Sequence, residues 1–166
     1  ITEACGDQAV TQSVIRLAPH STNTTPGRIG DYSVSGNNIS YCGYAGENLI
    51  THIEVDLDAN DGYLRAVGGT ISNNTCLGGA AIQQSIEKLY IPDKCLLFNG
   101  AGAQDPDNLE EGTHGLTVTG NSLGWADTVN CQIIGPGTFI NIQVDDNAVR
   151  GNPTHSYVWV MAENST

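Results

Sequence analysis

The sequence predicts an all-β protein, an antiparallel β-sandwich or jelly roll in one domain, with a single short helix. Three observations support this fold class. Short apolar runs are separated by turns that contain glycine, asparagine or proline, roughly every 8 to 12 residues. Residues 49–67 have the pattern of a hairpin, and only one stretch has helical spacing. The length of 166 residues suits one domain.

The clearest local pattern lies at residues 49–67. Aliphatic and polar side chains alternate over residues 52–59, which predicts a strand with one buried face and an acidic outer face. Asn60-Asp61-Gly62 follows, and Asp-Gly supplies the positive φ angles of a tight turn. We therefore predict an antiparallel hairpin in which residues 63–67 form the return strand.

The N-terminal part of the chain differs in composition from the rest. Residues 9–18 form a short apolar strand, and residues 19–27 contain two prolines and no aliphatic side chain, as is typical of a linker. We therefore divide the chain into a strand arm with its linker, residues 1–27, and a β-sandwich domain, residues 28–166. The apolar residues with which the arm would bind a partner are Val10, Val14, Ile15 and Leu17.

The sandwich domain is expected to contain strands throughout and one helix. The helix is predicted at residues 80–89, where apolar residues recur at helical spacing and Pro92 stops the pattern. No internal repeat is apparent along the chain. Further strands are expected at 31–35, 39–44, 70–72, 96–98, 116–119, 129–134, 138–145 and 156–161.

The charge balance excludes two classes of partner. Six Lys and Arg against 18 Asp and Glu give a net charge of −12, which repels nucleic acids and anionic lipid surfaces. No apolar run approaches the ~18 residues of a membrane-spanning helix, so membrane insertion is not expected. Divalent cations, neutral glycans and other proteins, including copies of the chain itself, remain as partners.

The cysteine spacing predicts disulfide bonds and not a metal site. Five cysteines are spread along the chain without a C-x-x-C pair, which disfavours zinc ribbons and thioredoxin-like redox sites. Cys76 and Cys95 flank the predicted helix, and we expect them to form a bridge. The other cysteines are Cys42, Cys131 and Cys5, of which Cys5 is the candidate for a bond to a second subunit.

Four Asn-x-Ser/Thr sequons, together with the widely spaced cysteines, predict an extracellular or cell-surface glycoprotein. All four sequons fall in stretches that are predicted to be loop or terminus. The acceptor residues are Asn23, Asn38, Asn73 and Asn164.

One motif resembles a catalytic signature. Residues 120–124 match the G-x-S-x-G nucleophile elbow, with Ser122 as the nucleophile and His155 as the base. The elbow requires a helix after the serine, whereas residues 125–134 have the composition of a strand. The motif is therefore interpreted as a glycine-rich turn, and the protein is not expected to be an enzyme.

Two acidic clusters are weak candidates for Ca²⁺ ligands, because Ca²⁺ prefers carboxylate and carbonyl oxygens. The first cluster departs from EF-hand spacing, and the second lies in a loop that could wrap around the ion. A solvated acidic surface is the simpler explanation for both. No other cofactor is expected. The candidates are Asp56, Asp58 and Asp61 in the first cluster and Asp105, Asp107 and Glu110 in the second.

These features together predict a structural subunit of an extracellular, glycosylated, disulfide-stabilised filament or surface fibre. The strand of the arm would leave its own domain and complete the sheet of a neighbouring copy. Head-to-tail contacts of this kind form filaments because they do not close. The alternative for the arm is that residues 9–18 are the first strand of their own sheet. A second hypothesis for the protein is a secreted carbohydrate- or calcium-binding sandwich, in which Trp125 stacks on a sugar ring rather than packing at the edge of the sandwich.

Overall fold

Every strand pairing among the described residues is parallel. The computed structural model describes residues 12–18, 27–40, 50–57, 63–78, 92–102, 112–126, 128–135, 138–151 and 156–160. This part of the chain contains seventeen strands and no helix. The strands form one sheet of five and three sheets of four. The predicted antiparallel sandwich is therefore wrong.

Each sheet is built from every fourth strand of the chain. The front sheet contains β1 (Gln12–Leu17), β5 (Ile50–Asp56), β9 (Lys94–Asn99), β13 (Val129–Ile134) and β17 (Ser156–Val160). The second sheet contains β2 (Gly27–Gly30), β6 (Tyr63–Val67), β10 (Gly112–His114) and β14 (Phe139–Ile140). The third sheet contains β3 (Ser33–Ser35), β7 (Thr70–Ser72), β11 (Thr117–Thr119) and β15 (Gln143–Asp145). The fourth sheet contains β4 (Asn38–Ser40), β8 (Thr75–Leu77), β12 (Ser122–Gly124) and β16 (Ala148–Arg150).

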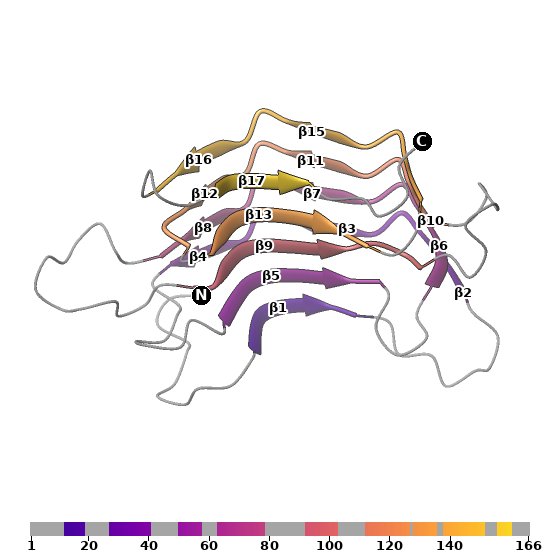
Figure 1. Ribbon diagram of the computed structural model, residues 1–166, viewed down its shortest axis with the longest axis horizontal. Coiled ribbons are helices and arrows are strands. Elements are labelled where there is room, and N and C mark those ends of the chain that lie inside the picture. Colours follow the sequence, from indigo (N-terminus) through magenta and orange to yellow (C-terminus); the bar gives the residue numbers. More distant parts are fainter. Residues whose placement is uncertain are drawn as a thin grey trace, which may run out of the picture.

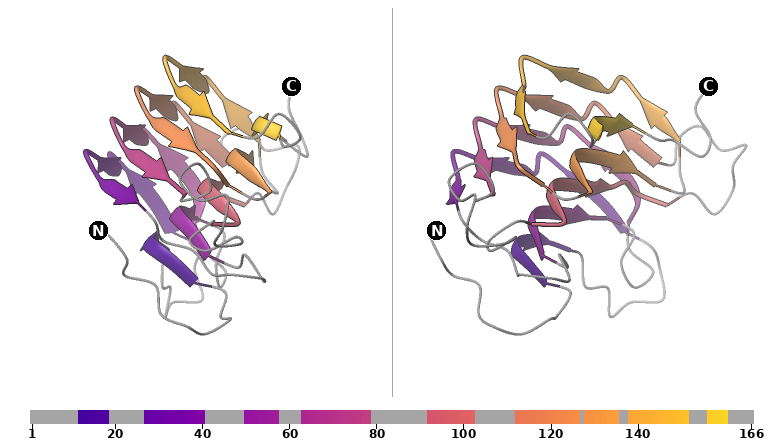
Figure 2. Two further views of the ribbon diagram at one scale, coloured as in Figure 1. Left: turned by 90° about the vertical axis from the view of Figure 1, so that its left-hand side faces the viewer. Right: turned by 60° about the vertical axis from the view of Figure 1, so that its left-hand side comes forward.

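The chain winds as a coil, because consecutive strands lie in consecutive sheets. Four strands complete one coil, and the next strand returns to the front sheet beside the strand four positions earlier (Figure 1). Strands β1–β4, β5–β8, β9–β12 and β13–β16 form the first to fourth coils, and β17 begins a fifth. Figure 2 shows the coils stacked as layers from two further directions. The architecture is a single-chain parallel β-helix.

Two bends in every coil require a left-handed backbone conformation. The bend between the second and third sheets and the bend between the third and fourth each begin with a residue of positive φ, between 50° and 73°. All eight residues are Gly, Asn or Asp, the types that adopt this conformation at the lowest cost. They are Asp31, Gly68, Gly115 and Asn141 at the first bend and Gly36, Asn73, Gly120 and Asp146 at the second.

The connections between strands are constant at these two bends and variable beside the front sheet. β2 ends at Gly30 and β3 begins at Ser33, and each corresponding connection in the other coils also contains two residues. The connections that enter and leave the front sheet range from residues 135–138 to the much longer residues 78–93. Length differences between coils therefore occur only beside the front sheet.

Aliphatic side chains point into the coil and pack in rows that run from one coil to the next. In the front sheet Ile53 is the register partner of Leu96, and Val55 is the partner of Phe98. All four side chains are fully buried, as is Leu57, which confirms the predicted inward face of this strand. Two further rows are Val34, Ile71, Val118 and Val144 in the third sheet, and Ile39, Cys76, Leu123 and Val149 in the fourth.

The hairpin predicted at residues 49–67 is not formed. β5 pairs with β1 and β9, whereas β6 pairs with β2 and β10, so the two strands do not pair with each other. The chain instead turns from the front sheet into the second sheet between them. The turn predicted at residues 60–62 and the helix predicted at residues 80–89 lie outside the described residues.

The coil contains an internal repeat that was not apparent from the sequence. Four ten-residue segments occupy equivalent positions, and each has a left-handed residue first and sixth and an asparagine seventh. Equivalent asparagines are 37, 47 and 26 residues apart, because the connections beside the front sheet differ in length. The segments are DYSVSGNNIS (31–40), GGTISNNTCL (68–77), GLTVTGNSLG (115–124) and NIQVDDNAVR (141–150).

The packing of inward side chains in rows predicts at which positions a substitution by alanine lowers the free energy of unfolding most. Ile71→Ala should lower the free energy of unfolding by about 2–5 kcal/mol, because the side chain is fully buried between two coils. Val67→Ala should change it by less than about 0.5 kcal/mol, since Val67 is 42% exposed on the outer face. Urea unfolding followed by far-UV circular dichroism measures both values. Equal losses for the two variants would contradict the inward orientation of the third-sheet row.

Candidate assembly surface

A ladder of four buried or half-buried asparagines runs through all four complete coils. The side-chain amide of Asn37 donates to Asn74 Oδ1 at 2.9 Å, and that of Asn74 donates to Asn121 Oδ1 at 2.9 Å. The amide of Asn121 donates to Asn147 Oδ1 at 2.8 Å. Each acceptor oxygen also receives the main-chain N–H of the preceding asparagine at 3.0 Å. The ladder thus joins each coil to the next through two hydrogen bonds.

The second hydrogen of the side-chain amide points back to the preceding coil. Asn74 Nδ2 donates to the Val34 carbonyl at 3.0 Å, and Asn121 Nδ2 donates to the Ile71 carbonyl at 3.0 Å. Asn147 Nδ2 donates to the Val118 carbonyl at 2.9 Å. A buried amide needs all of these partners, because an unsatisfied polar group inside a protein is costly. The ladder therefore fixes the register between coils.

The two ends of the ladder are chemically different. All ladder bonds run in one direction, from amide donors in one coil to an amide oxygen in the next. At the fourth coil, the main-chain N–H of Asn147 has no acceptor among the described residues. At the first coil, Asn37 Oδ1 receives no donor in the same part of the chain. One end therefore offers a hydrogen-bond donor and the other offers the matching acceptor.

The fourth coil is the more open end of the apolar core. Its inward residues Ile142, Val144 and Val149 are half-buried. Their equivalents one coil below are fully buried, namely Leu116, Val118 and Leu123. No described strand pairs with the outer edges of β14, β15 and β16. This end of the coil therefore presents unpaired main-chain groups around partly exposed aliphatic side chains.

The first coil presents the opposite edge with less exposed apolar surface. No described strand pairs with the outer edges of β2, β3 and β4. Their inward residues Val34 and Ile39 are buried, at 8% and 0% exposure, and Ile29 is half-buried against the core. A partner at this end would therefore be held mainly by main-chain hydrogen bonds.

The strand of the predicted arm pairs with a strand of its own chain. β1 pairs in parallel with β5, with Ile15 beside Ile53 and Leu17 beside Val55. Val14, Ile15 and Leu17 are half-buried against the core, whereas Val10 lies outside the described residues. The strand, observed as Gln12–Leu17, thus belongs to its own sheet, as in the alternative, and the prediction that it leaves its own domain is wrong.

The arm is also held by charge. The Arg16 guanidinium lies 3.4 Å from a Glu54 carboxylate oxygen and 2.9 Å from one of Asp56. The Ser13 hydroxyl donates to Glu54 as well. Because Arg16 is half-exposed, each ion pair is expected to contribute less than about 1 kcal/mol.

The predicted disulfide bond is absent. Cys76, Cys95 and Cys131 are all free and buried. The Cys95 thiol lies 3.3 Å from the Cys76 carbonyl oxygen and 3.4 Å from that of Gly124, so it acts as a buried hydrogen-bond donor. The bridge was wrong because it assumed that Cys76 and Cys95 meet across a helix, whereas they belong to adjoining strands of different sheets. Cys5 and Cys42 lie outside the described residues.

The sequons are placed only in part. Asn38 and Asn73 are exposed on the fourth sheet and at the second bend, respectively. The Ser40 hydroxyl of the first of these sequons donates to Asn38 Oδ1 at 3.1 Å. Asn23 and Asn164 lie outside the described residues. Glycosylation therefore stays a prediction, with two acceptors in accessible positions.

The calcium candidates are not brought together within the described chain. Asp56 is engaged by Arg16 and by Asn99, whose side-chain amide donates to it at 2.9 Å. No group of three or more His, Cys, Asp or Glu is placed to hold a metal ion within the described ranges. The remaining candidates lie outside the described residues, namely Asp58, Asp61, Asp105, Asp107 and Glu110.

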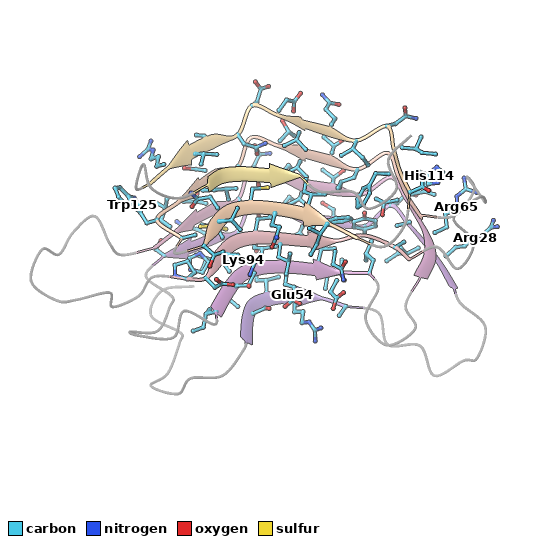
Figure 3. All side chains as sticks on the ribbon, viewed as in Figure 1. Arg28, Glu54, Arg65, Lys94, His114 and Trp125 are labelled. Carbon is cyan, nitrogen blue, oxygen red and sulfur yellow. The ribbon has the colours of Figure 1, made fainter. Side chains whose placement is uncertain are left out.

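Ser122 and Trp125 lie at the fourth sheet. Ser122 begins β12, and its main-chain N–H donates to the Asn74 carbonyl at 2.7 Å, so it stands in a strand and not at an elbow before a helix. His155 is outside the described residues. Trp125 follows this strand at a φ of 63° and is half-buried. In Figure 3 it lies at the opposite end of the molecule from Arg28, Arg65 and His114. Sugar stacking by Trp125 stays a prediction.

The asparagine ladder is the feature of the candidate surface that sequence reasoning missed. Its signal is the same in all four repeats. The second residue after an inward aliphatic residue is Gly, Asn or Asp, and the third is Asn. Two of these asparagines lie in patterns that have another interpretation, Asn74 in the sequon of Asn73 and Asn121 in the G-x-S-x-G match.

Comparisons with models of protein families, with curated proteins and with solved structures found no match. Among the described residues, no helix is long and apolar enough to cross a membrane.

The buried thiols give a direct test of the cysteine arrangement. In a Cys5→Ser, Cys42→Ser variant, DTNB at about pH 8 should label no thiol in the folded chain and three after unfolding without reductant. Burial raises the pKa of Cys76 and of Cys131 to about 12, and it raises that of Cys95 as well, so the reactive thiolate is scarce. Only one thiol after unfolding would instead reveal a bridge between two of them.

The ladder predicts that replacing an asparagine in its middle lowers the free energy of unfolding more than replacing one at its end. Asn121→Ala should lower the free energy of unfolding by at least about 3 kcal/mol, because several buried partners lose a hydrogen bond at about 1–3 kcal/mol each. Asn37→Ala, at the end of the ladder, should cost about 1 kcal/mol. Chemical denaturation of the two variants under identical conditions provides the comparison. A cost for Asn37→Ala as large as that for Asn121→Ala would show that the ladder is not what holds the coils in register.

Proposed function

We propose that the chain is a non-enzymatic structural subunit that associates end to end with copies of itself. The observation that carries this proposal is the pair of complementary coil ends. The fourth coil offers unpaired strand edges, half-buried aliphatic residues and the donor end of the asparagine ladder. The first coil offers parallel strand edges and the acceptor end.

Strand addition supplies the binding energy in this proposal. A second copy that continues the register places its β2, β3 and β4 on β14, β15 and β16. Main-chain hydrogen bonds then extend three sheets across the junction. The Asn147 N–H would donate to Asn37 Oδ1 of the second copy, as the Asn121 N–H donates to Asn147 within the chain. Val144 would pack on Val34, in the manner of the row below it.

The ends are compatible in charge although the chain as a whole is acidic. In the continued register Asp145 lies beside Ser35, and Arg150 lies beside Ser40, so no like charges are opposed there. A hydrogen bond from Gln143 holds the pKa of Asp145 below its usual value, with a further contribution from Thr119. The net charge of −12 per copy still opposes association at long range. Added salt should therefore favour it.

The contact is heterologous, because one end of the coil binds the opposite end of the next copy. A contact of this type does not close on itself unless the rotation happens to form a ring. The proposed assembly is a linear stack in which the coil axis continues from copy to copy. An extracellular location belongs to the same proposal and is supported by the two exposed sequon asparagines, Asn38 and Asn73.

Sedimentation velocity over a concentration series tests the proposal. The chain should form species larger than a monomer as concentration rises, and increasingly so with added NaCl, while negative-stain electron microscopy shows linear stacks. Val144→Asp should weaken association by about tenfold or more, because it places a charge in the apolar junction. Val67→Asp adds the same charge on an exposed outer face and should have little effect.

A chain that stays monomeric at every soluble concentration and salt would refute end-to-end association. Equal weakening by Val144→Asp and Val67→Asp would show that net charge, and not the open coil end, controls association. Circular dichroism of both variants establishes that each retains the folded coil.

A further inference from the structure

We infer that β17 is an exchangeable cap, which occupies the place on β13 that β1 of a second copy takes in the stack. The inference rests on the proposed end-to-end association. β17 is the strand that must move, and β1 of the second copy is the strand that replaces it. β17 pairs with β13 in the free chain, and β1 pairs with β5.

The numbers of strands in the four sheets require this exchange. The front sheet has five strands and the other sheets have four. When β2, β3 and β4 of a second copy continue the other sheets, its β1 falls beside β13. That edge of β13 is already paired with β17. Both strands cannot use the same hydrogen-bonding edge, so one of them has to leave.

The two competing strands carry similar residues at three of their five aligned positions. Through the registers of the front sheet, Ile15 belongs to the row that ends at Val158. Leu17 likewise belongs to the row that ends at Val160, and Ser13 to the row that ends at Ser156. The strand sequences SVIRL and SYVWV therefore place serine and aliphatic residues at the same positions. β1 of a second copy can pair with β13 in the register that β17 uses now.

The exchange costs β1 none of the contacts that it makes within its own chain. β1 would keep its own partner β5, the ion pairs of Arg16 and the half-buried contacts of Ile15 and Leu17. It would pair with β13 through its other edge. The parallel pairing that is lost between β13 and β17 is replaced by a parallel pairing between β13 and β1 of the second copy. Each of the three other sheets gains one new pairing. The net gain therefore comes from those three sheets.

The cap keeps the edge of β13 paired in the free chain, where β17 is the last described strand of the front sheet. β17 covers this edge until the correct partner aligns three other strands at the same time. Donation of the N-terminal strand thus takes place without β1 leaving its own chain.

A reversible lock tests the role of β17. Gln132 and Trp159 are register partners on β13 and β17, and adjacent strands lie within the ~4.4–6.8 Å Cα separation that a disulfide requires. A Gln132→Cys, Trp159→Cys variant in the Cys5→Ser, Cys42→Ser background should lose association by about tenfold or more when oxidised and regain it with reductant. Gln132→Cys alone is the matched control. Unchanged association of the oxidised, locked chain would overturn the exchange.

Cross-linking tests the new partner of β13. In the stack, Arg16 of a second copy takes the row position of Trp159 and faces Gln132. Arg16→Cys with Gln132→Cys should therefore form disulfide-linked multimers, because within one chain the two positions are ~14 Å apart, three strand spacings. Arg16→Cys with Leu97→Cys is the control, since β9 has no free edge.

The outcomes separate the two proposals. Association without the Arg16–Gln132 cross-link overturns the exchange and leaves end-to-end association in place. Absence of association in the unlocked chain overturns both. Cross-linked multimers from the first pair and none from the second support the exchange.

Discussion

The fold depends on keeping equivalent residues of successive coils directly above one another. Each coil has two bends whose first residue has positive φ, and the asparagine that completes the second bend bonds to its counterparts in the adjoining coils. If the register slipped by one residue, every inward side chain would face outward and the ladder would lose its partners. The buried amides of Asn74 and Asn121 therefore specify, together with the aliphatic rows, which residues of successive coils are aligned.

The position of most strands could be predicted from sequence, but their partners could not. β6, β7 and β13 have the predicted bounds, because period-two alternation and flanking turn residues are local signals. The same alternation is compatible with parallel and antiparallel pairing. The choice at residues 49–67 relied on one Asp-Gly pair, although the pairing partners of β5 are tens of residues away in sequence. Partner choice is a non-local property, and no short motif encodes it.

The candidate surface was harder to predict than the strands. The repeat is visible only after the variable connections beside the front sheet are removed, which the unequal spacings of the asparagines conceal. The cysteines were misleading for a related reason. Cys76, Cys95 and Cys131 are small apolar residues of the packed interior, and a wide spacing in sequence is equally typical of a disulfide framework. The arm was located correctly as a strand, but its place beside β5 could not follow from composition.

The two bends of fixed length have a consequence for how such a chain can change. Their geometry is tied to the ladder, so they tolerate neither insertion nor deletion, whereas the corners that flank the front sheet already accept segments as short as 135–138 and as long as 78–93. Variation in length and preservation of the register are thereby confined to different corners of the same coil. New binding loops can be grafted one at a time around the front sheet, and the supporting framework does not have to be redesigned for each of them.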